Sequence, residues 1–229
     1  MEDFENRFVE KCDLYIQEAS DQTNFDEEML SLITGIIPLL DEATKKHEKQ
    51  KRKRLNSLKY EYINQKKIAT FLAYVNFFQV DIFTSLKYLC ISKNETEKKY
   101  FIKQAYAYIY EFLQILKSDN TVVLSKEIEK ISNDAFLSLT IMTKEMEKFS
   151  NTENYKLMKM VRNKISNHYD DDALLYINLL KQLEEIEAVE EITKVFHLIK
   201  YCKDFNQILM PILADKIENN NQILKEINA

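Results

Sequence analysis

Glycine and proline are nearly absent from this chain, and their scarcity constrains the fold more than any single motif. The 229 residues include one glycine and two prolines, and 30% of all residues are charged. Tight turns and hairpins between β-strands depend largely on glycine and proline. The sequence leaves few positions for either, and we therefore predict an all-α fold.

Apolar residues in the middle of the chain recur at steps of three and four, which is typical of a helix with one face in a core. The clearest such stripe runs from Ile68 to Leu89. Further apolar residues lie off this stripe, namely Tyr74, Phe77, Val80 and Tyr88. A helix that is apolar on two sides is either central in its bundle or shared with a second subunit.

Three positions are expected to interrupt helices. Ser20 and Asp21 should close a short first helix, because short polar side chains form hydrogen bonds with the nearby backbone. Pro38 should kink or break one helix and Pro211 should break another, since proline lacks a backbone N–H and clashes with the preceding turn.

Residues 45–54 are almost wholly charged and mostly basic, although the chain as a whole has a formal net charge of -5. One interpretation is a solvated helix that ends an N-terminal extension, residues 1–57, and leads into a domain of residues 58–229. The other is an RNA-binding arm, because clustered basic residues attract phosphates without reading bases. Lys51, Arg52 and Arg54 are then candidate RNA contacts.

The remaining composition argues against several classes of protein. Cys12, Cys90 and Cys202 lie far apart in the sequence, without the short spacing of a zinc site or an even number for disulfides. The first residues are acidic and polar, and we find no apolar run long enough to cross a bilayer. We expect a soluble cytoplasmic protein with no metal, no cofactor and no membrane partner.

Polar chemistry is concentrated between Met160 and Asp170. Asn163 directly follows Arg162, and His168 lies six positions after the arginine. Arginine stays charged in any pocket, whereas histidine exchanges protons near neutral pH. A fixed cation, an amide and a titratable imidazole are the groups needed to act on a phosphodiester.

The spacing of Arg162, Asn163 and His168 resembles the R-x(4–6)-H signature of the HEPN superfamily, in which a polar residue often follows the arginine. The resemblance implies an antiparallel up-and-down helical bundle, with a core of four to five helices and extra N-terminal and C-terminal helices. The minimal HEPN toxins have a tyrosine two positions after the histidine, where this chain has Asp170. The resemblance is closer to the larger HEPN proteins of abortive infection and other phage or stress defence.

HEPN nucleases imply a site and an assembly for this chain. They act as homodimers, place two signatures in one cleft and cleave RNA without a metal, leaving 2′,3′-cyclic phosphate and 5′-hydroxyl ends. His168 would be the base for the ribose 2′-hydroxyl or the acid for the leaving oxygen. Arg162 would stabilise charge on the phosphoryl oxygens, and Asn163 would orient the phosphate. Lys164 and Tyr169 are candidate RNA contacts, and a regulatory or antitoxin partner is expected.

The geometry of one helix leaves two arrangements open. Six residues of α-helix correspond to about 9 Å of rise and about 240° of rotation, so Arg162 and His168 could not hold one phosphate together. Either the helix ends before His168, as the acidic run that starts at Asp170 favours, or two subunits form the pocket. Lys103, Glu111 and Asp170 are candidate polar residues of this pocket, although for Lys103 and Glu111 we favour a position at its edge.

A second hypothesis needs no catalysis. Arginine, asparagine and histidine near a helix C-terminus can simply cap its last carbonyls. The chain would then be a non-catalytic helical module that binds a partner protein, a nucleotide or RNA. A metal-bound bundle is the weakest alternative, because the inward Glu and Glu-x-x-His pattern of di-iron proteins is absent from the sequence.

Overall fold

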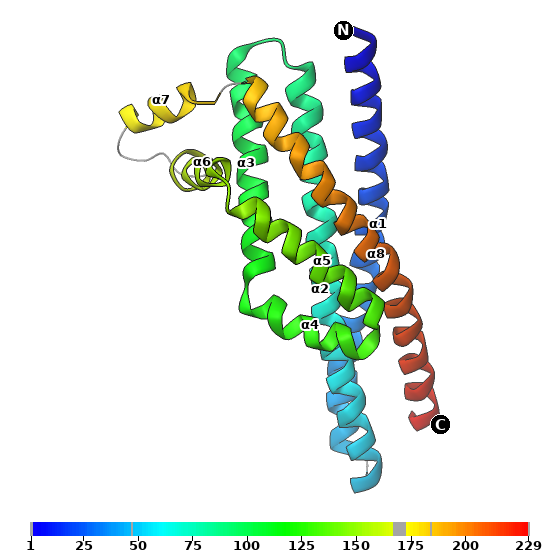
Figure 1. Cartoon of the computed structure of the whole chain (residues 1–229). Helices are drawn as coiled ribbons and strands as arrows, with labels where there is room; N and C mark the ends of the chain where they lie inside the picture. The colour runs from blue at the N-terminus through cyan, green and yellow to red at the C-terminus, as the bar shows by residue number, and fades with distance from the viewer. Residues whose placement is uncertain (1, 47, 167–172, 184, 229) are drawn as a thin grey trace.

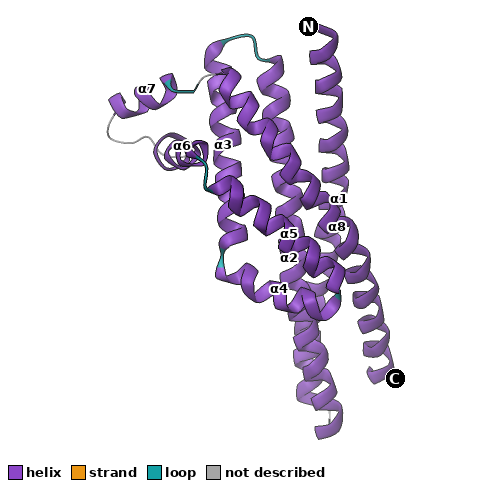
Figure 2. Ribbon diagram, in the orientation of Figure 1, coloured by secondary structure: helices purple, strands orange, loops and turns teal. Residues whose placement is uncertain are grey.

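A computed structural model describes residues 2–46, 48–166, 173–183 and 185–228, and every regular element in these ranges is a helix (Figures 1 and 2). The all-α prediction is confirmed. In chain order the helices are α1 (Glu2–Lys46), α2 (Lys49–Ile91), α3 (Glu95–Lys117), α4 (Asp119–Ile131), α5 (Asn133–Ser150), α6 (Glu153–Val161), the π-helical turn η1 (Arg162–Ser166), α7 (Ala173–Lys181) and α8 (Glu185–Asn228).

Polar side chains cap the shorter helices at their N-termini. Asn94 precedes α3 and its side chain accepts a hydrogen bond from the backbone N–H of Glu97. Ser118, Ser132 and Thr152 accept corresponding bonds at the starts of α4, α5 and α6. Each cap satisfies a backbone donor that has no partner within the helix. Short connections can therefore join these helices without glycine.

Buried residues recur every seven positions on each of the three long helices, α1, α2 and α8. They are Cys12, Ala19, Asp26, Ile33 and Leu40 on α1, Leu55, Tyr62, Ala69, Asn76 and Phe83 on α2, and Ile192, Ile199, Asn206, Leu213 and Asn220 on α8. A repeat of seven residues is the pattern of coiled-coil packing. The α1–α2 hairpin is antiparallel, and α8 crosses α1 obliquely while running in the same general direction (Figure 1).

A polar layer, consisting of Asp26, Asn76, Gln79 and Asn206, crosses this coiled coil. The Nδ2 of Asn76 donates to Oδ2 of Asp26 at 2.7 Å, and the Nδ2 of Asn206 donates to Oδ1 of Asn76 at 2.5 Å. Gln79 donates to the same oxygen of Asn76 at 3.3 Å. All four side chains are buried. A buried polar residue at a heptad position favours the one register in which its partners meet.

The expected helix end at Ser20 and Asp21 and the expected break at Pro211 are wrong, because α1 continues through Ser20 and Asp21 and α8 continues through Pro211. Pro38 does not break α1 either. Ala19 and Asp26, on either side of the first position, are buried and hold the helix in the coiled coil. Both prolines are exposed. Each proline leaves one backbone carbonyl of the preceding turn without a hydrogen-bond partner, and at an exposed position this carbonyl can face water. Tertiary packing keeps the helix continuous.

Stacked aromatic rings join α2 to α3 and to α8. Phe78 of α2 stacks on Phe112 of α3 with ring centroids 4.0 Å apart, and Phe83 stacks on Phe196 of α8 at 5.3 Å. Although α2 contacts α1, α3, α4 and α8, its second apolar side is not fully covered. Tyr74 and Phe77 are 48% and 50% exposed.

The boundary expected between residues 57 and 58 lies inside α2, which begins at Lys49 and packs along α1. Within α2, one window of 18 residues is long and apolar enough to cross a membrane by length and composition. The expectation that no apolar run reaches this length is therefore wrong. The same window is 67% buried inside the bundle, as a central helix requires.

Candidate functional site

The HEPN-like signature lies where α6 ends. Tyr155, Met158 and Val161 are buried and fix α6 against the bundle, and α6 ends at Val161. Arg162–Ser166 then forms η1, a π-helical turn, a form that occurs mostly as single turns and frequently at functional sites. The α-helix thus ends before His168, which was one of the two expected arrangements. His168, Tyr169 and Asp170 lie outside the described residues.

The guanidinium group of Arg162 is held from two directions. Its Nε and Nη2 both contact Oε1 of Glu111 on α3, and Nη1 donates to Oδ1 of Asn163 at 3.2 Å. Its Cζ lies 6.0 Å from the ring centroid of Tyr110. The side chains of Arg162 and Glu111 are 35% and 45% exposed. Together these four residues, the arginine cluster, form a half-open polar site between α3 and η1.

The arginine cluster still has hydrogen-bonding capacity. A guanidinium group has five N–H donors, and the contacts with Glu111 and Asn163 use three of them. Bidentate recognition of phosphate requires two N–H donors in one plane. Arg162 therefore retains enough donors, with respect to the described residues, to bind a phosphate.

A second group of side chains extends from Tyr110 along α3, and the sequence did not lead us to expect it at this site. Tyr110 stacks on Tyr155 of α6 with ring centroids 5.7 Å apart, and Gln114 donates to the hydroxyl of Tyr155 at 2.7 Å. Lys117 lies 5.3 Å from the centroid of Tyr155 and donates to Ser150 at 2.7 Å. The spacing of residues 110, 114 and 117 on one helix face was the signal that could have revealed this row.

The other candidate residues lie in different places. Lys103, the other candidate pocket residue on α3, lies two helical turns from Glu111, with its Nζ 5.4 Å from the ring centroid of Tyr100. Burial lowers the pKa of Lys103. Lys164 is exposed on η1. Lys51 and Arg52 lie with Arg54 at the start of α2, at the end of the hairpin and far from α6 (Figure 1).

The cysteines and acids do not gather into a metal site among the described residues. In those ranges, no group of three or more His, Cys, Asp or Glu side chains lies close enough to hold a metal ion. Cys12 and Cys202 are buried and Cys90 is half-buried. Burial raises the pKa of the Cys12 thiol to about 12, so this thiol stays protonated near neutral pH.

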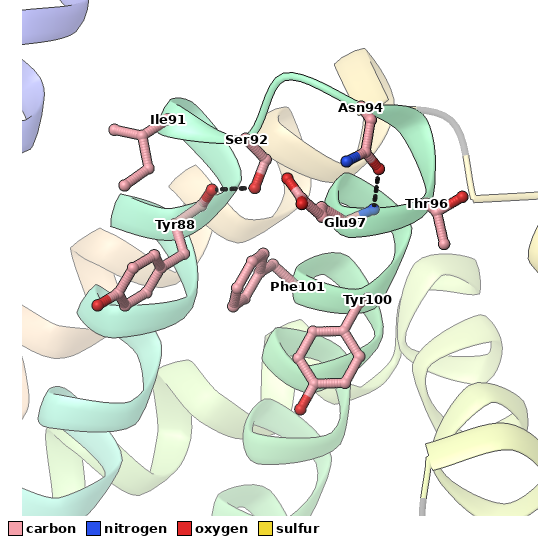
Figure 3. A pocket seen from close by; sticks show the side chains of 8 residues that line it. All are labelled: Tyr88, Ile91, Ser92, Asn94, Thr96, Glu97, Tyr100 and Phe101. Carbon is pink, nitrogen blue, oxygen red and sulfur yellow. Dashed lines mark hydrogen bonds between the residues drawn. The ribbon is translucent and has the colours of Figure 1, made fainter.

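A hollow lies at the connection between α2 and α3, away from the arginine cluster (Figure 3). Its volume is about 780 Å³. Several of its polar atoms serve helix ends, since Ser92 donates to the carbonyl of Tyr88 and Asn94 caps α3. Tyr88 and Phe101 stack at its base. This hollow brings together no acid–base pair, and we do not assign it a reaction.

Comparisons of the chain with protein-family models, with curated proteins and with solved structures found no match. The fold and the arginine cluster therefore define the class of protein on their own. It is an all-α helical bundle with a central coiled coil and a half-exposed arginine at the end of α6.

Proposed function

We propose that this protein is a metal-independent endoribonuclease of the HEPN type. The observation that carries the proposal is the position of Arg162. The arginine of the signature is half-exposed, held in one orientation by Glu111 and Asn163, and retains N–H donors that suit a phosphate. The α-helix ends at Val161, directly before the arginine, and this end supports the proposal because joint action with His168 requires that the α-helix does not continue to it.

The proposed reaction needs one cation and one proton-transfer group. His168 takes the proton of the ribose 2′-hydroxyl, whose oxygen then attacks the adjacent phosphorus. Arg162 stabilises the negative charge that develops on the phosphoryl oxygens, and Asn163 orients the phosphate. The bond between phosphorus and the 5′-oxygen breaks, and that oxygen receives a proton from a histidine. The products are a 2′,3′-cyclic phosphate end and a 5′-hydroxyl end.

Glu111 has a positioning role in this proposal. Its carboxylate contacts two nitrogens of Arg162 and thereby fixes the plane of the guanidinium group. The carboxylate also opposes an incoming phosphate through its negative charge. Lys164, exposed on η1 two residues after Arg162, supplies positive charge that offsets part of this opposition.

A homodimer, a regulatory or antitoxin partner, cytoplasmic location and a role in phage or stress defence belong to the same proposal. In a dimer, two His168 side chains could divide the base and acid roles. The surface of α2 supports the assembly, because Tyr74 and Phe77 are half-exposed and monomeric proteins rarely expose large apolar patches.

The same exposed aromatic residues favour a second candidate function. A helical module without catalytic activity could use Tyr74 and Phe77 to bind a partner protein, because aromatic residues are enriched in interfaces. Under this hypothesis, replacing His168 by alanine would leave the cellular phenotype unchanged.

The deciding experiment is cleavage of mixed cellular RNA by the purified protein in excess chelator. The wild type is compared with Arg162→Ala and His168→Ala, and the product ends are identified. Loss of cleavage in both variants, with cyclic phosphate ends in the wild type, is the expected result. Equal cleavage by all three proteins would indicate a contaminant or another site, and no cleavage by any would favour the binding module.

A further inference from the structure

The end of the α1–α2 hairpin is strongly basic, although the rest of the protein is acidic. Residues 45–54 contain seven lysines and arginines and one glutamate, a net charge of +6. The rest of the chain therefore carries -11 within the formal total of -5. The described residues of this segment, 45–46 and 48–54, form the hairpin tip, and all of them are exposed.

The fold holds the hairpin tip in a defined position. Leu40 and Leu55, one on each arm, are fully buried directly behind it. Lys59 and Asp41 form an ion pair between the arms, and the hydroxyl of Tyr62 donates to Asn221 of α8 at 2.7 Å. Figure 1 shows the tip projecting beyond α4 at the end of the bundle farther from α6. A rigid base thus presents the basic residues to solvent.

The hairpin tip is too distant to belong to the arginine cluster. Phe78 stacks on Phe112, so Glu111 lies near residue 78 along α2. Arg52 precedes Phe78 by 26 residues of the same helix. At 1.5 Å per residue, the tip and the arginine cluster are about 39 Å apart along the bundle axis. One ligand must be long to reach both.

We propose that the hairpin tip binds the phosphate backbone of RNA at a site separate from the cleavage site. The choice of RNA rests on the proposed function, whereas the polyanionic character of the ligand rests on the charge of the tip. Successive residues are 100° apart around a helix, so residues 51–54 direct positive charge to all sides of α2. Such a distribution suits a phosphate backbone that passes or wraps around the tip.

The composition of the tip favours nucleic acid over a membrane surface. Membrane-bound amphipathic helices bury an apolar face in the lipid, and residues 45–54 contain no apolar side chain. Tyr60, which is 59% exposed, follows Arg54 by six residues. An exposed aromatic ring near basic residues can stack on an unpaired base. We therefore expect binding without sequence preference and with strong dependence on salt.

The test measures binding of RNA by the full-length His168→Ala protein, in which the substrate should stay intact. The tip variant replaces Lys51, Arg52, Lys53 and Arg54 with glutamine. The matched control replaces four exposed lysines elsewhere, Lys93, Lys126, Lys144 and Lys200, with glutamine and has the same net charge. Equal thermal unfolding midpoints establish that both variants are folded, and the pair Lys51→Gln and Arg54→Gln serves as a milder tip variant.

We expect the tip variant to bind long single-stranded RNA at least tenfold more weakly than the control. Its slope of log affinity against log salt should be smaller by about 0.7 for each phosphate that the tip no longer neutralises. In the wild-type background, cleavage of oligonucleotides too short to span the two sites should be the same for tip variant and control. Equal RNA affinity and salt slope in tip variant and control would overturn the inference.

The outcomes also separate this inference from the proposed function. If RNA binding depends on the tip but the wild-type protein cleaves nothing, the endoribonuclease proposal fails and the tip site stands. If cleavage requires Arg162 but RNA binding does not depend on the tip, the endoribonuclease proposal stands and the tip site fails. If the tip variant no longer binds vesicles of anionic phospholipid but still binds RNA as the control does, the tip binds a membrane surface and the inference is contradicted.

Discussion

The polar layer of Asp26, Asn76, Gln79 and Asn206 lies between three long helices, whereas the arginine cluster lies at the end of a short one. Both contain a carboxylate held by nitrogen donors. The side chains of the polar layer are at most 5% exposed, but Arg162 and Glu111 are 35% and 45% exposed. The carboxylate of Asp26 can change its hydrogen-bond partner only if the coiled coil opens. The carboxylate of Glu111 can contact a ligand directly.

This difference indicates which polar residues stabilise the fold and which are available to bind a ligand. A buried polar group must find its partners within the fold, so it selects one register and contributes to specificity. A half-exposed group loses little when its partner changes, because water takes its place. Three experiments test the contrast and a fourth changes a position outside both clusters, in order from the largest expected effect to the smallest.

Arg162→Ala should lower the rate of RNA cleavage by about 100-fold or more, because it removes the donors that stabilise phosphoryl charge. It should change the free energy of unfolding by less than about 1 kcal/mol, since the pair with Glu111 is half-exposed. Initial cleavage rates and urea unfolding provide the two measurements. A loss of stability as large as that of a core variant would show that the arginine cluster is structural.

Asn76→Ala should destabilise the protein by about 2 to 4 kcal/mol, because it leaves buried groups of Asp26 and Asn206 without hydrogen-bond partners. The cleavage rate per folded molecule should not change. Asn64→Ala is the matched control, since Asn64 also lies on α2 but its bond to Glu127 is only partly buried. Equal unfolding midpoints in urea for the two variants would contradict the role given to the polar layer.

Asp26→Asn should stabilise the protein at pH 7 by about 2 kcal/mol and have little effect near pH 4. Burial raises the pKa of Asp26 from 3.8 to about 6. Between these values the folded state binds more protons than the unfolded state. The favourable contribution is therefore complete below pH 4 and is lost as the pH rises through 6.

Urea unfolding at the two pH values measures this effect, and Asp215→Asn, an exposed position on α8, is the control. A wild type that loses as much stability as the Asp26→Asn variant between pH 4 and pH 7 would show that Asp26 titrates normally.

Gly35→Ala should stabilise the protein by roughly 0.5 to 1 kcal/mol, because alanine favours the helix and glycine does not. Gly35 lies within α1, and a Cβ atom added there would meet no other atom within 4 Å. The substitution touches neither polar cluster. Thermal unfolding should shift upward while the cleavage rate stays constant, and a lower midpoint would mean that α1 is strained at this position.

The fold class could be predicted from the sequence because the scarcity of glycine and proline is a property of composition. The heptads of α1 could not be predicted, because three of their buried positions are occupied by Cys12, Ala19 and Asp26, which are not large apolar residues. Pro38 does not break α1 because it lies on an exposed face of the helix, and tertiary packing decides which face is exposed. An exposed proline is tolerated where a buried one is not.

The candidate site was predictable only in part. Arg162 and Asn163 were identified from their spacing, and Glu111 was selected because it is a charge among aromatic residues. The contact between Glu111 and Arg162 joins residues 51 positions apart, and no local pattern encodes such a pairing. Lys103 resembles Glu111 in its sequence surroundings, but it lies two turns away and contacts Tyr100.

The seven-residue spacing of the coiled coil also has a consequence for how related chains could differ in length. An insertion or deletion in the α1–α2 hairpin preserves the buried positions when it adds or removes seven residues in both arms. Each such paired change would move the hairpin tip by about 10 Å along the bundle axis. The distance between the basic end and Arg162 could therefore vary in evolution only in discrete steps, and each step would select ligands of a different length.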